Sequence, residues 1–181
     1  MSIDAEQRRR HQRGATLAET LVAIGVGGVV IAVLASFSYY ATVSLARQLN
    51  YAELAAASQS TVDQLTRDAR CANRVTSAST TSLVLEDFDG AALTYAYNAA
   101  QRTLTRTKNG VSRVLLTGCD AFTLTLGARN PAGPFESYPT ATAADCKVIS
   151  VSWQCSRAIL GNQTTTENLA SAKIIIRRQG T

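Results

Sequence analysis

The chain has 181 residues, of which 46% are hydrophobic and 17% charged, and its formal net charge at pH 7 is +5. This length suits one domain with an appendage. The positive charge is concentrated before the first apolar run, and the rest of the chain has no basic stripe with interleaved aromatic residues, so the composition does not indicate nucleic-acid binding. The charged residues before that run are Arg8, Arg9, Arg10 and Arg13 against Asp4 and Glu6.

A long apolar run, residues 15–39, follows this basic segment and contains one carboxylate, Glu19. About 20 helical residues cross the roughly 30 Å hydrocarbon core of a bilayer, so the run is long enough to span it. The basic flank should stay in the cytoplasm and the bulk of the chain, with the C-terminus, outside. An acid at mid-bilayer costs roughly 2.5–3.5 kcal/mol on insertion scales. Glu19 therefore needs either a shallow, solvated position or a partner.

An ordinary secretory signal is the main alternative to a spanning helix. Residues 33–35 (Val-Leu-Ala), followed by Ser36, match the small-residue cleavage site of such signals. Two observations oppose this interpretation: Glu19 interrupts the early apolar core, and the chain beyond Ala35 continues with a helical pattern.

The second half of the expected helix is amphipathic. No proline or glycine occurs between Ser36 and Asn73, and apolar residues recur mostly at three- or four-residue steps, with one wider gap across residues 58–60. One helix is therefore expected from about Ala15 to about Ala72. Its predicted apolar stripe consists of Leu45, Leu49, Ala52, Ala56, Val62, Leu65 and Ala69.

The start of this helix, RGATLAETLVA from Arg13 to Ala23, resembles the class III signal of type IV pilins and pseudopilins. That family has a short basic leader ending in glycine, cleavage after this glycine, and a glutamate at the fifth mature position. Gly14 and Glu19 match these two residues, and Ala15 stands where the family usually has phenylalanine. The resemblance implies cleavage after Gly14 by a prepilin peptidase and N-methylation of Ala15. It also implies that Glu19 pairs with the N-terminal amine of a neighbouring subunit and so sets register in a fibre.

After Asn73 the pattern changes to short alternating or β-branched segments, which predict strands. Asn109-Gly110 is a strong type I′ hairpin signal, and Asp89-Gly90 marks another tight turn. Successive hairpins imply an antiparallel sheet, and packing it on the amphipathic half of the helix gives an α+β, pilin-like fold. The predicted strands are residues 82–86, 92–97, 103–106, 111–116, 122–126, 148–153 and 173–177.

The expected organisation has four segments and two loops. Residues 130–144 and 161–166 are irregular and are predicted to be surface loops. The segments are a cytoplasmic leader (1–14), the transmembrane and assembly half of the helix (15–40), its amphipathic half (41–75) and a β-rich domain outside the cytoplasm (76–181).

The four cysteines are Cys71, Cys119, Cys146 and Cys155, and none forms a Cys-x-x-Cys pair. A metal site is not expected, because the ligands are not clustered. An even number of cysteines behind a membrane signal suggests an oxidising compartment and up to two disulfides, with buried free thiols as the alternative. Cys146 and Cys155 flank one strand whose ends lie about 30 Å apart when straight, whereas a disulfide needs Cα atoms within about 7 Å. We predict that each pairs with Cys71 or Cys119, and not with the other.

Catalytic constellations are not visible in the sequence. No histidine follows the leader to serve a serine or cysteine nucleophile, and residues 86–90 lack the spaced ligands of an EF-hand, so a polar hairpin turn is favoured there. Trp153 alternates with Ile149 and Val151, which favours a core position. We therefore expect neither an enzyme nor a cofactor.

Over its whole length the chain resembles the larger minor pilins and minor pseudopilins, the W type of type IV pili and the J type of type II secretion. The resemblance lies in the N-terminal signal, the helix-closing segment 62–70 (VDQLTRDAR) and the hairpin-rich domain. It implies a structural subunit that spans the bacterial inner membrane once and assembles with other pilin or pseudopilin subunits. Two alternatives remain: a membrane-tethered binding protein that never polymerises and uses loops 130–145 and 161–168, and a secreted β-domain released after Ala35.

Overall fold

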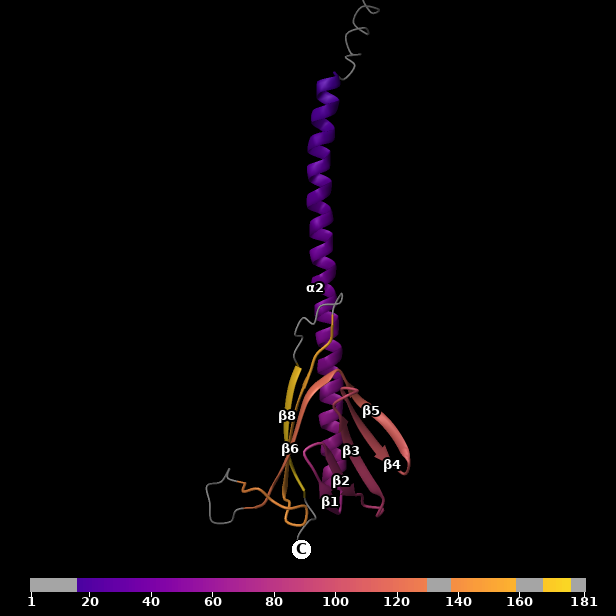
Figure 1. The fold of residues 1–181 in the computed structure, drawn as a ribbon, viewed down its shortest axis with the longest axis vertical. Helices are drawn as coiled ribbons and strands as arrows, with labels where there is room; N and C mark the ends of the chain where they lie inside the picture. The colour runs from indigo at the N-terminus through magenta and orange to yellow at the C-terminus, as the bar shows by residue number, and fades with distance from the viewer. Residues whose placement is uncertain (1–15, 130–137, 159–167, 177–181) are drawn as a thin grey trace, which may run out of the picture. The chain divides into compact units, whose positions relative to one another are not determined.

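The computed structural model describes residues 16–129, 138–158 and 168–176. The described part contains a long helix, α2 (Leu17–Cys71), and two antiparallel sheets, which confirms the expected α+β fold (Figure 1). The chain forms two compact units that divide between Leu45 and Ala46. The four-segment organisation expected from the sequence stays a prediction. The strands are β1 (Arg74–Ala78), β2 (Ser82–Glu86), β3 (Ala92–Asn98), β4 (Thr103–Lys108), β5 (Val111–Thr117), β6 (Cys119–Gly127), β7 (Val148–Cys155) and β8 (Asn168–Ile175).

In the first unit, α2 presents apolar side chains on all sides. None of the residues from Thr16 to Leu45 is buried. Leu17 is 80% exposed, and Ile24 and Phe37 are each 72% exposed. The helix is long and apolar enough to cross a membrane.

In the second unit, α2 buries one stripe at three- and four-residue spacing, which consists of Leu54, Ser58, Thr61, Leu65 and Ala69. The sequence pattern placed Leu65 and Ala69 correctly. It was wrong for Leu45 and Leu49, which are 57% and 58% exposed, and for Ala52 and Ala56, which are exposed as well.

Two polar residues explain why the stripe was misplaced. The Ser58 hydroxyl accepts a hydrogen bond from Nε1 of Trp153 at 3.1 Å, and the Thr61 hydroxyl donates to the Ala57 carbonyl at 2.8 Å. Because these bonds satisfy the hydroxyls, both residues can lie in the core. A pattern that counts only apolar residues passes over them.

The strands form two sheets where one was expected. β1 to β5 make a five-stranded meander, and β6, β7 and β8 make a three-stranded sheet. The seven predicted strands are present, and β1 is an additional one. The chain passes from the first sheet to the second at Gly118, whose φ is +70°. A Cβ on Gly118 would lie 2.5 Å from the carbonyl oxygen of Ser156, so this close approach requires glycine.

The two predicted hairpin turns are confirmed. Asn109 and Gly110 both have positive φ, 52° and 76°, as a type I′ turn requires, and they join β4 to β5. Asp89-Gly90 lies between the paired strands β2 and β3.

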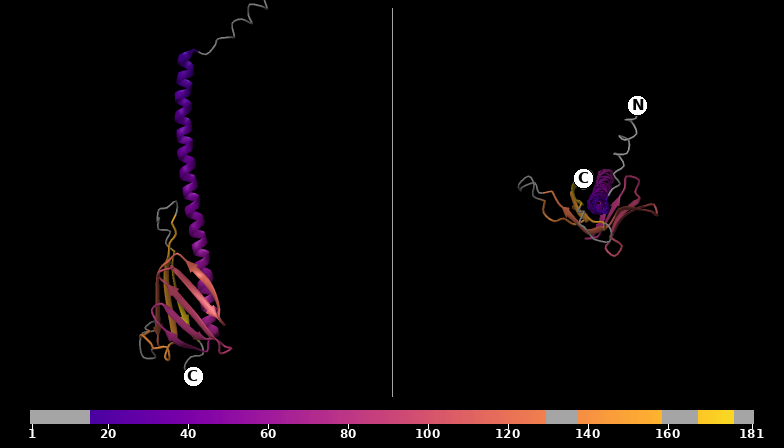
Figure 2. Two further views of the ribbon diagram at one scale, coloured as in Figure 1. Left: turned by 45° about the vertical axis from the view of Figure 1, so that its right-hand side comes forward. Right: turned by 90° about the horizontal axis from the view of Figure 1, so that it is seen from above.

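One hydrophobic cluster joins the second half of α2 to both sheets. Figure 2 shows the sheets spreading to either side of this part of the helix. Trp153 is 1% exposed, which confirms its predicted core position. The largest buried side chains are those of Trp153, Tyr95, Leu83, Leu85, Leu93, Leu104, Leu116 and Ile149.

Candidate functional site

The N-terminus of α2 is closed by a side-chain cap on Thr16. The Thr16 hydroxyl accepts a hydrogen bond from the backbone N–H of Glu19 at 3.3 Å, three residues on. Thr16 and Glu19 thus have the spacing of a capping box, in which threonine at the N-cap is followed by glutamate at the third helical position. This cap fixes where the helix begins and therefore where Glu19 lies.

Glu19 is exposed in the first turn of α2. A carboxylate there interacts favourably with the N-terminal end of the helix dipole, typically by about 0.3–1 kcal/mol at an exposed position. The acid therefore has a local stabilising role even without a partner from another chain. Gly14 and Ala15, the predicted cleavage site and methylated residue, lie outside the described residues.

From Glu19 the apolar half of α2 continues as a surface on which no side chain up to Leu45 is buried by the described part of the chain. At three glycines within it, Gly25, Gly27 and Gly28, an added Cβ would meet no heavy atom within 4 Å. Such a surface suits lipid or the helices of other molecules. Its large exposed side chains include Leu17, Leu21, Val22, Ile24, Val26, Val29, Val30, Ile31, Val33, Leu34 and Phe37.

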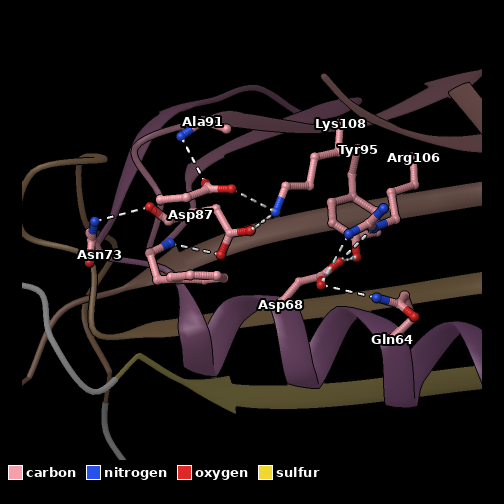
Figure 3. Close-up of polar contacts among 10 residues, drawn as sticks. Gln64, Asp68, Asn73, Asp87, Ala91, Tyr95, Arg106 and Lys108 are labelled. Carbon is pink, nitrogen blue, oxygen red and sulfur yellow. Dashed lines mark hydrogen bonds and ion pairs between the residues drawn. The ribbon is translucent and has the colours of Figure 1, made fainter. Parts of the chain in front are cut away.

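A second polar arrangement centres on Asp68, near the end of α2 (Figure 3). Arg106 of β4 donates to both oxygens of this carboxylate, with Nε at 2.7 Å and Nη2 at 3.2 Å, and the Tyr95 hydroxyl donates to it as well. Gln64 adds a further donor at 3.0 Å. Burial and the bond to Asp68 raise the pKa of Tyr95, and the bond to Asp68 raises the pKa of Arg106. This network ties the second half of α2 to β3 and β4.

The turn between β2 and β3 holds a third arrangement, also drawn in Figure 3. Asp87 pairs with Lys108 of β4, and Asp89 lies 3.2 Å from the same ammonium group. The hydrogen bond to Asp87 is the largest cause of a raised pKa at Lys108. The carboxylates of this turn therefore have a lysine between them. Among the described residues, no group of three or more potential ligands is placed to hold a metal ion.

The four cysteines, for which the sequence predicted up to two disulfides, occupy different environments. Cys71 is the exposed last residue of α2, and Cys146 is buried two residues before β7. Cys119 and Cys155 are both buried and lie opposite each other on β6 and β7. All four are free thiols in the structure, so the predicted disulfides stay predictions.

Sequence reasoning missed three features of these sites. The cap on Thr16 had a readable signal, because threonine followed three residues later by glutamate before an apolar run is typical of a helix start. The Asp68–Arg106 pair had none, since it joins residues 38 positions apart. The register that aligns Cys119 with Cys155 depends on a bulge between Cys119 and Ala121, which the strand pattern does not reveal.

One region of the chain matches a known protein family. Residues 9–35 match the family model of the prokaryotic N-terminal methylation motif. The chain matches no curated protein and no solved structure. The matched region includes Gly14 and Glu19 and runs into the exposed apolar half of α2, as in a membrane-anchored pilin. The motif points to a structural, non-enzymatic protein, and together with the apolar helix and the β-sheets it supports a type IV pilin-like or pseudopilin-like protein.

Proposed function

We propose that this protein is a minor pilin or minor pseudopilin, of the W or J type, which assembles into or primes a type IV pilus or a type II secretion pseudopilus. The observation that carries the proposal is the methylation motif at residues 9–35, continuous with an apolar helix that has no buried residue before Leu54. An exposed apolar surface of this length is covered by lipid or by neighbouring subunits.

The chain first resides in the bacterial inner membrane with a single span. The arginines of the leader keep residues 1–14 in the cytoplasm, and the β-rich domain lies outside. Prepilin peptidase then cleaves after Gly14 and leaves the α-amine of Ala15, which is N-methylated. Methylation of an amine keeps its positive charge.

Assembly places the first half of α2 among the same helices of other subunits. Glu19 then lies near the N-terminal amine of a neighbour, and the pair avoids the penalty that each charge alone would suffer in an apolar surrounding. Because a misaligned subunit leaves both charges unpaired, the pair sets the register between subunits.

A membrane-tethered protein that never polymerises is the second candidate. It shares the span and the β-domain, and it differs in lacking fibre contacts. The mature N-terminus and the presence of the protein in fibres separate the two candidates, and a mature protein beginning at Ser36 would exclude both in favour of a secreted domain.

The test is a set of substitutions in full-length protein, made in cells that contain a prepilin peptidase. Gly14→Leu should block cleavage and leave precursor in the membrane, whereas Gly28→Ala, a control glycine in the same matched region, should be processed normally. Intact-mass measurement of the N-terminus reads the outcome. Finding the parent protein uncleaved in these cells would favour the tether.

Glu19 tests the assembly step separately. Glu19→Gln keeps the size of the side chain and removes its charge, so this variant should be inserted and cleaved but should be depleted from sheared fibres. Glu19→Asp keeps the charge and should restore part of the incorporation. If Glu19→Gln enters fibres as well as the parent, the ion pair is wrong, and capping of the helix N-terminus is a sufficient account of this acid.

A further inference from the structure

Two buried thiols face each other across the second sheet. Cys119 begins β6, Cys155 ends β7, and the register of the antiparallel pair places them opposite one another. Both side chains are 0% exposed. They are 36 positions apart in the chain, so the fold brings them together.

The backbone hydrogen bonds show which kind of pair they form. The N–H of Cys119 donates to the carbonyl of Arg102 at 2.9 Å and not to Cys155. The next bond of the ladder runs from the N–H of Ser156 to the carbonyl of Gly118, at 2.8 Å. The two cysteines therefore form a non-hydrogen-bonded pair, in which opposite Cα atoms lie about 4.5 Å apart. This separation falls within the Cα range of disulfides, roughly 4.4–6.8 Å.

The closeness of the two thiols affects their acidity. The neighbouring Cys155 raises the pKa of Cys119, and the neighbouring Cys119 lowers the pKa of Cys155. The Cys119 thiol itself donates to the carbonyl of Ala121 at 3.3 Å. Cys155 is therefore the easier of the two to deprotonate, and the thiolate is the nucleophile of thiol–disulfide exchange.

Side chains around the pair hold the two strand ends in place. Arg102 forms an ion pair with Asp120 at 2.5 Å and donates to Ser156 Oγ at 3.0 Å, so it bridges the residues that follow the two cysteines. The Tyr97 hydroxyl donates to the carbonyl of Cys119 at 3.1 Å. Together with the close approach at Gly118, these contacts fix the separation of β6 and β7 at the cysteines.

The other two cysteines have different surroundings. Cys146 lies beyond the opposite end of β7 from Cys155, and its thiol contacts the carbonyl of Val148 at 3.5 Å. Cys71 is exposed at the end of α2. Of the possible pairings, only Cys119 with Cys155 is placed in register by the sheet.

We infer that Cys119 and Cys155 form a cross-strand disulfide that joins β6 to β7 when the protein meets an oxidising thiol buffer, and that Cys71 and Cys146 take no part in it. When the strand ends open locally and expose the pair, the Cys155 thiolate attacks one sulfur of the reagent disulfide, breaks its S–S bond and forms a mixed disulfide. Cys119 then loses its proton to solvent and attacks the sulfur of Cys155, which releases the second thiolate of the reagent. Two protein thiols are oxidised and one reagent disulfide is reduced to two thiols.

In the cell, the oxidant would be a thiol–disulfide oxidoreductase outside the cytoplasm, so occurrence there depends on the location given under the proposed function. The bond would lock the strands at the point where the chain passes between the sheets.

The test uses full-length protein purified in detergent micelles, reduced, and then brought to a constant thiol titre in a mixture of oxidised and reduced glutathione. Remaining thiols are alkylated in denaturant, and the protein is digested with trypsin without reduction. Each cysteine then lies in a peptide of its own, residues 71–74, 114–129, 130–147 and 148–157. The expected product is the linked pair 114–129 with 148–157, two hydrogens lighter than the sum of its parts, with Cys71 and Cys146 alkylated. Recovery of all four cysteines alkylated, or of a link to Cys71 or Cys146, would overturn the inference.

Thermal unfolding gives a second measurement that does not depend on mapping. A reductant should lower the midpoint of the oxidised parent, and Cys146→Ala, the control for a buried cysteine outside the pair, should keep this response. The double variant Cys119→Ala/Cys155→Ala should lose it, and retention of the response would contradict the assignment.

Protein taken from cells, acid-quenched and mapped in the same way, separates this inference from the proposed function. A link that forms in glutathione but is missing in cells leaves the pairing intact and argues against the proposed location.

Discussion

The two halves of α2 differ in what determines their sequence. None of residues 17–45 is buried, and they include most of the large exposed apolar side chains among the residues that the structure describes. From Ala46 onward the same helix buries a stripe that runs from Leu54 to Ala69 against both sheets. The apolar sequence of the first half suits an environment of lipid or other subunits, whereas the sequence of the second half is set by packing against the chain's own β-domain.

Similar substitutions in the two halves should therefore affect different measured properties. In the second half they should change the free energy of unfolding, and in the first half they should change only insertion or assembly. Trp153 is the only tryptophan of the chain, and it is hydrogen-bonded to Ser58 of the helix, so its fluorescence reports on unfolding of the second unit.

The largest contrast is expected between Leu65 and Ile24. Leu65→Ala removes a side chain that is 2% exposed and should lower the free energy of unfolding by about 2–5 kcal/mol, because the core cannot fully close the cavity. Ile24→Ala shortens a side chain that is 72% exposed and should leave this free energy unchanged. Urea unfolding of full-length protein in micelles, followed by Trp153 fluorescence, measures both. Equal losses from the two variants would break the comparison.

The second contrast concerns acids. Asp68→Asn weakens the paired bonds from Arg106 and should lower the free energy of unfolding by about 1.5–3 kcal/mol. The effect is this large because solvent only partly screens the two side chains, of which Asp68 is 12% exposed and Arg106 is 21% exposed. Glu19→Gln in the first half should leave unfolding of the second unit unchanged, while fibre incorporation falls. The same urea titration applies, and Asp68→Asn together with Arg106→Gln should cost less than the sum of the single changes. Additive costs would show that the two side chains do not interact.

Glycines give the third contrast. Gly118→Ala forces a Cβ to within 2.5 Å of the Ser156 carbonyl at a φ of +70°, and we expect a loss of about 1–3 kcal/mol. Gly110→Ala has a similar φ of +76° and open space, so it separates backbone strain from the clash. Gly28→Ala in the first half should leave the unfolding of the second unit unchanged. A Gly118→Ala cost no larger than that of Gly110→Ala would show that Ser156 moves aside without penalty.

The sequence predicted the elements better than it predicted their faces. Strands and hairpin turns followed from local alternation and from Asn109-Gly110, and residues 82–86 were placed at both ends. The buried face of α2 was misplaced in its earlier turns because Ser58 and Thr61 enter the core through hydrogen bonds that no local pattern reveals.

The candidate sites divide in the same way. Glu19 and the processing motif are local in sequence and were readable there, and the family model matches the same region. The pairs Asp68–Arg106 and Cys119–Cys155 arise from strand order and register. Register depends on the bulge after Cys119 and on the crossing at Gly118, which are set by packing of the whole second unit.

The smallest expected effect concerns Tyr95 and appears as a pH dependence. Its hydroxyl is buried and donates to Asp68, so the pKa of Tyr95 in the folded protein is raised above its ordinary value of 10.0. Above pH 10 the unfolded chain loses this proton while the folded protein keeps it, so the stabilisation present below pH 10 is lost as pH rises. For this group alone, the free energy of unfolding falls by at most about 1.4 kcal/mol for each pH unit.

Tyr95→Phe should therefore lower the free energy of unfolding by about 0.5–1.5 kcal/mol at neutral pH, because the bond to Asp68 is lost. Above pH 10 the free energy of unfolding of this variant should fall less steeply with pH than that of the parent. Tyr40→Phe, at a position that is 72% exposed in the first half, should leave the neutral-pH stability unchanged. Urea titrations from neutral to alkaline pH give both quantities. Parallel curves for parent and Tyr95→Phe above pH 10 would mean that the folded protein does not hold this proton more tightly, and that the Asp68 network is looser than the geometry indicates.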